Sequence, residues 1–173
     1  MSPELIDMMH ESGCCSIVYG LESGSPKMLE VMEKRTTLEE NVQAQKLTIG
    51  KGYYSTILQF VIGMPGESPE TILETSKFAQ WSMTLSKHTN PHDLSINYAQ
   101  ALPGTPLYEF ARKKLLIGRS IEDEEDYLLA VSDKNASDPI AALNFTDYPT
   151  LEYWSWKYKI YLETLNEYIK TFG

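Results

Sequence analysis

Three short segments of this chain could line a binding site, because small or polar residues follow stretches typical of strands. Glu22 and Ser23 end the first stretch, residues 63–67 follow the second, and residues 100–105 follow the third. Glycines allow a backbone to approach a ligand closely, and a capped helix start such as Ser68 favours anionic groups. Gly and Pro also end strands for structural reasons, so the three segments carry more weight together than singly. Glu22 is the sharpest candidate, an acid directly after an apolar strand, with a helix cap or a surface acid as the alternative.

Nucleophilic and phosphate-binding motifs do not explain these segments. The three histidines, His10, His88 and His92, fall in a predicted helix and a predicted loop, away from the strand ends. The sequence has neither a Walker A motif nor G-x-G-x-x-G, which argues against a generic nucleotide-binding domain. Cys14 and Cys15 are adjacent, which suits neither a disulfide nor a zinc or redox site. We predict no catalytic or metal-binding residue from these patterns, and we expect free thiols in a reducing cytoplasm.

The elements that would position the three segments alternate between strand and helix. Residues 57–62 are apolar or β-prone apart from Gln59, which predicts a strand buried on both faces of a parallel sheet. Ser68 and Pro69 then cap a helix that reaches residue 83. Its expected inner residues are Ile72, Leu73, Ala79 and Met83. The other predicted strands are 16–21 and 93–101, and the other predicted helices are 3–12, 26–32, 37–49 and 105–111. This order predicts an α/β fold with parallel strands and right-handed crossovers.

The last third of the chain is less regular. Between residues 118 and 149 the periodic pattern breaks down, and the acidic run 122–126 is typical of a solvated face rather than a metal site. Residues 150–172 predict a long helix whose aromatic stripe packs on the sheet or on a part of the protein beyond this chain. The expected stripe is Leu151, Trp154, Tyr158, Tyr161, Leu165, Tyr168 and Phe172. We therefore divide the chain into residues 1–117 and a variable extension, residues 118–173.

Composition indicates a globular protein. The 173 residues are 42% hydrophobic and 23% charged, enough for one domain with a sizeable core. The net charge is −9 and Lys and Arg do not cluster, which disfavours nucleic acid as a main partner. No apolar run approaches the roughly 20 residues of a membrane span, and the first residues do not resemble a signal peptide. We therefore expect a cytoplasmic protein that acts on a small-molecule substrate.

Three motifs occur in an ordered series. They are Gly-Cys-Cys-Ser-Ile-Val-Tyr-Gly-Leu-Glu-Ser-Gly-Ser at 13–25, Phe-Val-Ile-Gly-Met-Pro-Gly-Glu-Ser at 60–68 and Leu-Pro-Gly-Thr-Pro-Leu-Tyr at 102–108. Together they resemble the second half of a radical S-adenosylmethionine (SAM) enzyme, of the subgroup that often carries a cobalamin-binding domain ahead of the radical core. The resemblance covers about residues 3–114. It implies the C-terminal half of a partial (β/α)6 barrel, that is its last three strands, followed by a C-terminal helical extension.

The resemblance also implies cofactors and contacts. Enzymes of this family use a [4Fe-4S] cluster, held by a C-x-x-x-C-x-x-C loop, to cleave SAM to a 5′-deoxyadenosyl radical. Glu22 matches the position that contacts the ribose hydroxyls, and Lys34 matches a cationic position that pairs with the methionine carboxylate. Ile62 and Gly63 match the segment that packs against adenine, and Ala99 matches a residue near the adenine edge. The full set of expected cofactor contacts is Glu22, Ser23, Lys34, Ile62, Gly63 and Ala99.

The chain also departs from the family. Nothing in it resembles the cluster loop, Cys14 and Cys15 cannot supply three spaced thiolates, and the first three strands have no counterpart. The segment after residue 62 does not complete the pattern G-x-I-x-G-x-x-E. We therefore expect part of an enzyme, inactive alone, whose partner is the missing N-terminal half of the core and whose cluster is bound outside this chain, as would be any cobalamin, whose use the sequence leaves open. The alternative is a noncatalytic half-barrel that serves as a binding or scaffold module. In either case an open sheet edge and an uncovered inner face predict poor solubility or oligomerisation.

Overall fold

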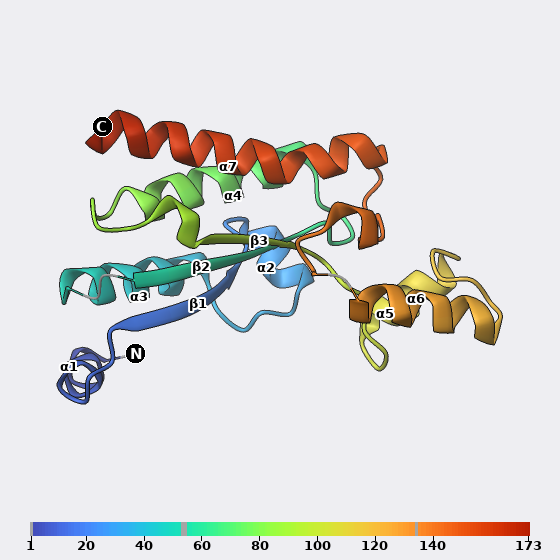
Figure 1. Ribbon diagram of the computed structural model, residues 1–173, viewed down its shortest axis with the longest axis horizontal. Coiled ribbons are helices and arrows are strands. Elements are labelled where there is room, and N and C mark those ends of the chain that lie inside the picture. The colour runs from blue at the N-terminus through green and yellow to red at the C-terminus, as the bar shows by residue number, and fades with distance from the viewer. Residues whose placement is uncertain (1, 53–54, 134) are drawn as a thin grey trace.

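Three parallel strands form the centre of the computed structural model, which describes residues 2–52, 55–133 and 135–173. The sheet has the order β1-β2-β3, with β1 (Ser16–Glu22), β2 (Ser55–Ile62) and β3 (Leu94–Tyr98) (Figure 1). The helices are α1 (Pro3–Glu11), α2 (Pro26–Val31), α3 (Leu38–Gly50), α4 (Pro69–Met83), α5 (Pro106–Lys113), α6 (Ile121–Asp133) and α7 (Thr150–Phe172). Short 3-10 turns lie at Pro91–Asp93 and Pro139–Ala141. The predicted α/β fold with parallel strands is confirmed, as is the helical extension.

Side-chain caps explain why the helix starts could be predicted. Ser2, Thr37, Ser68 and Thr105 each accept a hydrogen bond from a backbone N–H in the first turn of the helix that follows. Strand ends were less predictable. The third strand stops at Tyr98 rather than at residue 101, because β2 already ends at Ile62, to whose carbonyl the Ala99 N–H still donates.

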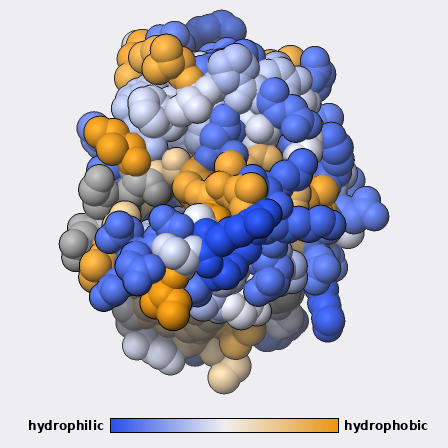
Figure 2. All heavy atoms as spheres, turned by 90° about the vertical axis from the view of Figure 1, so that its right-hand side faces the viewer, coloured by the Kyte–Doolittle hydropathy of each residue, from blue (hydrophilic) through white to orange (hydrophobic). Residues whose placement is uncertain are grey.

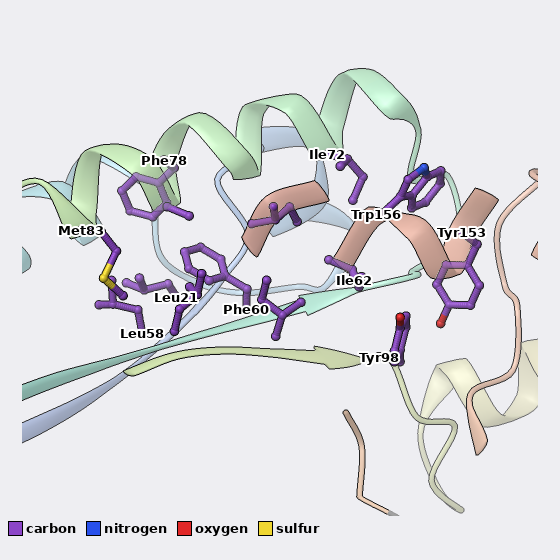
Figure 3. Packing of buried hydrophobic residues seen from close by; sticks show 14 residues of the cluster. Leu21, Leu58, Phe60, Ile62, Ile72, Phe78, Met83, Tyr98, Tyr153 and Trp156 are labelled. Atoms are coloured by element: carbon purple, nitrogen blue, oxygen red, sulfur yellow. The ribbon is translucent and has the colours of Figure 1, made fainter. Parts of the chain in front are cut away.

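The main core lies between the sheet and helices α4 and α7, which lie on the same side of it (Figures 1 and 3). Leu58, Phe60 and Ile62 of β2 point into this core and are 1% exposed or less. The opposite face is incompletely covered, since Val18 is 52% exposed and Gln59 is half-buried. The expectation that the central strand is buried on both faces is therefore met on one face only.

Helix α7 packs along α4 through a different stripe from the one predicted. Its buried residues are Tyr153, Trp156, Ile160 and Thr164. Four residues of the predicted stripe are instead exposed, namely Leu151, Tyr158, Leu165 and Phe172, while Trp154, Tyr161 and Tyr168 pack at the margin of the core. The stripe as a whole therefore does not pack on the core, because α7 carries apolar residues on most of its sides and periodicity alone allows two faces; its expected packing on a part of the protein beyond this chain stays a prediction. Leu73 of α4 is likewise 40% exposed, contrary to prediction, whereas the other three expected inner residues of α4 are buried.

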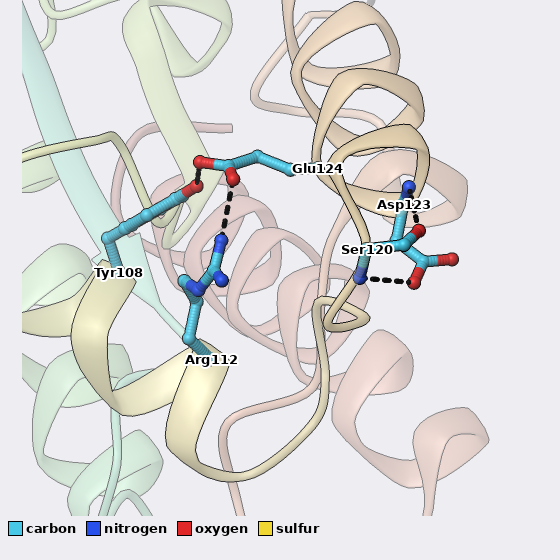
Figure 4. A network of polar contacts seen from close by, with 5 residues as sticks. All are labelled: Tyr108, Arg112, Ser120, Asp123 and Glu124. Atoms are coloured by element: carbon cyan, nitrogen blue, oxygen red, sulfur yellow. Dashed lines mark hydrogen bonds and ion pairs between the residues drawn. The ribbon is translucent and has the colours of Figure 1, made fainter.

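The irregular region contains a helix that the sequence pattern did not predict. Helix α6 begins with the acidic run, whose residues satisfy or complement the exposed N–H groups of a first turn. Asp123 accepts a hydrogen bond from the backbone N–H of Ser120, and the Asp123 N–H donates to the Ser120 hydroxyl (Figure 4). This reciprocal pair, three residues apart, was the signal that could have revealed the helix start.

Glu124 fastens α6 to α5. Its carboxylate accepts hydrogen bonds from the Tyr108 hydroxyl and from Nη1 of Arg112, the latter at 2.6 Å (Figure 4). These bonds, that from Tyr108 above all, lower the pKa of Glu124 below its ordinary value. Tyr127 adds a second fastening, because its hydroxyl donates to the Ala101 carbonyl and accepts from the Ala101 N–H. The loop after β3 is thereby held by the extension. In the part of the chain that the structure describes, no helix is long and apolar enough to cross a membrane.

Two substitutions on α7 test the observed packing face. Ile160 is fully buried and Leu162, on the same helix, is 60% exposed. We expect Ile160→Ala to lower the free energy of unfolding by about 2–4 kcal/mol through lost burial and a residual cavity, and Leu162→Ala to lower it by less than about 0.5 kcal/mol. Urea denaturation of both variants measures the difference. Equal losses would contradict the observed difference in burial between the two residues.

Candidate functional site

The strand β1 ends in an irregular turn that lifts one carboxylate over the sheet. The register between β1 and β2 shifts between Gly20 and Glu22, and Glu22 has a φ of 64°. This left-handed conformation costs a residue with a side chain about 1–2 kcal/mol. A Cβ added to Gly20 would lie 2.9 Å from Oε1 of Glu22, so the carboxylate lies directly over the glycine. Gly20 therefore leaves the space that the Glu22 side chain occupies.

Lys34 completes a charged pair at this point. Its Nζ donates to Oε1 of Glu22 at 2.6 Å, and the side chains are 36% and 22% exposed. Lys34 follows α2, and its backbone N–H bonds to the Leu29 carbonyl and so fixes the end of that helix. Glu22 and Lys34, two of the residues expected to contact SAM, thus form an ion pair with each other at the carboxyl end of the sheet. Figure 2 views the molecule from that end, where a mostly hydrophilic surface is interrupted by separate apolar patches.

Ser23, by contrast, turns toward α4. It is fully buried, its hydroxyl lies 2.9 Å from Oγ1 of Thr75, and it accepts the N–H of Ser25 at 3.0 Å. Gly24 lies equally close to α4, because its N–H donates to the same threonine hydroxyl. These bonds anchor the segment after β1 to α4, and they occupy the polar group of Ser23.

The ends of β2 and β3 lie side by side. The Ala99 N–H donates to the Ile62 carbonyl at 2.8 Å, which brings together two of the expected adenine contacts. Both side chains are buried, at 0% and 3% exposure, so at this edge the two residues present backbone rather than side chain. Gly63 follows with a φ of 90°, a conformation that glycine adopts without strain.

Glu67 is a buried acid that the sequence analysis placed in a loop but not among the site residues. Its side chain is 2% exposed and accepts the N–H of Gly63 at the other end of the same loop. Burial raises the pKa of the Glu67 carboxyl to about 7, although the N–H groups of Gly63 and Met64 and the charge of Lys27 act in the opposite direction. Lys27 also donates to the Gly66 carbonyl at 2.7 Å. The loop is therefore stabilised from within by Glu67 and from α2 by Lys27.

Tyr153 of α7 covers the other side of Gly63. A Cβ added to this glycine would lie 2.5 Å from the tyrosine ring. Neither Tyr153 nor Glu67 belonged to the predicted site. An isolated acid after Pro-Gly gave a weak signal, and the tyrosine gave none, because only the tertiary structure brings α7 to the end of β2.

The donor set of this chain does not suit an iron–sulfur cluster. Across residues 2–52, 55–133 and 135–173, no group of three or more His, Cys, Asp and Glu side chains could hold a metal ion. Cys14 and Cys15 are both free, and as sequence neighbours they offer two thiolates at most. The ligands of any cluster must come from residues outside the described part of the chain.

Comparison with known proteins agrees with the geometry. Residues 1–79 match the family model of the radical SAM superfamily. This part of the chain is therefore similar to that superfamily. Of the expected cofactor contacts, Glu22, Lys34 and Gly63 fall inside the matched range, while Ala99 lies beyond it.

Three relatives share part of this sequence, and the similarity to two of them is longer than the matched range. The chain is 34% identical over 108 residues to an uncharacterized methyltransferase of Pyrococcus horikoshii, covering 60% of this chain and 21% of that protein. It is 26% identical over 132 residues to the hopanoid C-2 methylase of Rhodopseudomonas palustris, covering 73% and 23%. It is 31% identical over 77 residues to the anaerobic magnesium-protoporphyrin IX monomethyl ester cyclase of Rubrivivax gelatinosus, covering 44% and 14%. The chain thus matches less than a quarter of the length of each of these relatives.

Two glycines test the closeness of Tyr153. Gly63 and Gly66 have φ values of 90° and 80°, so alanine at either position carries a left-handed strain of about 1–2 kcal/mol. Only at Gly63 does the added Cβ meet a neighbour, whereas at Gly66 it meets open space. We expect Gly63→Ala to destabilise the protein by about 1–3 kcal/mol more than Gly66→Ala, by overpacking. Thermal or urea unfolding compares them, and equal effects would contradict the observed contact.

The buried Glu67 carboxyl should make stability depend on pH. The folded state raises its pKa above the unfolded value of about 4.3, so the folded state binds the proton more tightly. This stabilisation is complete below about pH 4 and is lost as the pH rises through about 7, a change of the order of 3 kcal/mol. We expect it to appear as the difference in unfolding free energy between the wild type and Glu67→Gln across that range.

Glu70→Gln provides the matched control for this pH dependence. A hydrogen bond with Ser68 lowers the pKa of the exposed Glu70 carboxyl, so its removal should change the pH dependence slightly and in the opposite direction. A flat difference curve for Glu67→Gln would show that Glu67 ionises as an ordinary acid.

Proposed function

We propose that residues 1–117 are the C-terminal part of a radical SAM core and bind SAM, with Glu22 and Lys34 as the principal contacts. The observation that carries this proposal is their charged pair, held over Gly20 at the carboxyl end of the sheet. SAM offers complementary groups, namely ribose hydroxyls that can donate to a carboxylate and an amino-acid carboxylate that can pair with an ammonium group. In the absence of the ligand the two side chains neutralise each other, and binding would exchange this ion pair for contacts with the ligand.

The remaining predicted contacts would act mainly through backbone. Ile62 and Ala99 bury their side chains and are joined by a hydrogen bond, so adenine would meet the main chain at the end of β2 and β3. Gly63, whose Cβ position is occupied by Tyr153, would meet adenine through its backbone as well. Ser23 would hold the segment after β1 against α4 rather than touch the ligand.

The complete protein would need groups that this chain does not provide. Bound SAM supplies a 5′-deoxyadenosyl radical when a reduced [4Fe-4S] cluster lies beside it, and the cluster would be held by residues outside this chain. By the same resemblance, any cobalamin would be bound outside this chain. Methyl transfer is the reaction that we propose for the complete protein, because two of the three relatives are named as methylating enzymes. The cytoplasm is the compartment that we propose, given two free thiols.

Neutralising either member of the charged pair tests this proposal. A hydrogen bond to a charged group contributes about 1.5–3 kcal/mol, so we expect Glu22→Gln and Lys34→Met each to weaken SAM binding by about 10- to 100-fold. Isothermal titration calorimetry on the complete protein would measure the dissociation constants.

The Asp7–Lys51 pair supplies the control. Its Nζ and Oδ1 lie 2.8 Å apart between α1 and the end of α3, away from the strand ends. We expect Asp7→Asn to leave SAM binding unchanged. Normal affinity in Glu22→Gln, or an equal loss in Asp7→Asn, would refute the assignment of the site.

A further inference from the structure

The loop at residues 63–67 is held by one of its own side chains and by side chains of α2 and α7. Glu67 accepts a hydrogen bond from the Gly63 N–H, and Lys27 of α2 donates to the Gly66 carbonyl. Tyr153 of α7 lies against Gly63 from the opposite side. Of these three side chains, only Tyr153 comes from the extension, residues 118–173.

Tyr153 packs closely against Gly63, and its ring is confined by its neighbours. Three atoms of the tyrosine, including its hydroxyl oxygen, lie within 2.5–2.8 Å of the place where a Gly63 Cβ would stand. The ring is fully buried and is itself wedged between Tyr98 and Trp156, at centroid distances of 5.1 and 6.0 Å (Figure 3). A ring held on both sides cannot move away from the glycine without repacking the core.

Two buried polar atoms at this contact have no hydrogen-bond partner among the described residues. They are the hydroxyl oxygen of Tyr153 and Oε1 of Glu67. Burial above all raises the pKa of Tyr153, and the nearby Tyr98 and Glu67 act in the same direction. An unsatisfied buried polar group costs about 1–3 kcal/mol, so it is the ring of Tyr153, and not its hydroxyl, that stabilises the contact with Gly63.

We infer that Tyr153 is a positioning residue, through which helix α7 sets the conformation of the loop after β2 and hence the adenine side of the proposed SAM site. The functional half of this inference, that Tyr153 affects SAM binding, rests on the proposed function. The structural half, that Tyr153 holds the loop, rests only on the contacts of Gly63. It assigns to the extension a role in the cofactor site, although the extension supplies no side chain to the proposed cofactor contacts.

Hydrogen exchange of two backbone amides tests the structural half. The Gly63 amide bonds to Glu67 inside the loop, and the Ala99 amide bonds to Ile62 at the neighbouring strand end. We expect Tyr153→Leu to increase the exchange rate of Gly63 at least 10-fold relative to that of Ala99. Tyr153→Phe keeps the ring and should leave this ratio within about 3-fold of the wild type. If Tyr153→Leu does not fold, Tyr153→Met takes its place.

Ile160→Ala is the matched control, because Ile160 is buried on the same helix and the atoms nearest to a Gly63 Cβ belong to Tyr153 instead. It should raise the exchange of both amides to a similar extent by lowering global stability. A proportional rise at Gly63 and Ala99 in Tyr153→Leu, or a selective rise at Gly63 in Ile160→Ala, would overturn the inference.

SAM titration of the complete protein tests the functional half. We expect Tyr153→Leu to weaken binding by about 10-fold and Ile160→Ala to leave it unchanged. Unchanged affinity in Tyr153→Leu, with wild-type protein that binds SAM, would refute the role of α7 in the site. A wild-type protein that does not bind SAM would refute the proposed function instead, while the exchange ratio still decides whether Tyr153 holds the loop.

Discussion

Burial of one face of a three-stranded parallel sheet under α4 and α7 determines where every residue of the candidate site lies. The alternating side chains of β2 commit Leu58, Phe60 and Ile62 to the helices. Their neighbours along the strand must then point to the other face, where Gly20 and the Glu22 carboxylate also lie. The Glu22–Lys34 pair can remain partly exposed because the apolar side chains of β2 are buried against the helices instead.

Left-handed backbone conformations and charged side chains occur together at the carboxyl ends of β1 and β2. Glu22 adopts a left-handed conformation, and Gly63 and Gly66 use conformations that favour glycine. Such conformations persist only where surrounding contacts hold them, and here Lys34, Glu67 and Lys27 provide these contacts. These conformations lie at the carboxyl ends of β1 and β2, the end of the sheet where parallel α/β sheets bind their ligands.

The extension is integrated with the core rather than appended to it. Helix α6 holds the loop after β3 through Tyr127, and α7 presses Tyr153 on the loop after β2. Two of the three loops at the site are therefore supported by residues beyond position 117. A sequence change in the extension can consequently affect the site without contacting a ligand.

Sequence patterns alone predicted the order of the strands and of the helices other than α6, the helix caps and the position of Glu22 at the end of a strand. These features depend on local periodicity and on residues a few positions apart. Three ordered motifs also indicated the similarity to the radical SAM superfamily that the family model finds over residues 1–79. Local patterns did not reveal α6, whose start carries charge instead of periodic apolar residues. They selected a stripe of α7 that does not as a whole pack on the core, because that helix is apolar on most sides.

Only the tertiary structure decided which groups meet. Lys34 lies 12 residues from Glu22 in the sequence, yet their side chains form one ion pair. Tyr153 reaches Gly63 across 90 residues of chain because α7 packs on α4, and the close fit of its ring to a glycine depends on three-dimensional shape. The raised pKa of Glu67 has the same origin, since an acid in a loop becomes buried only after the helices around it have packed.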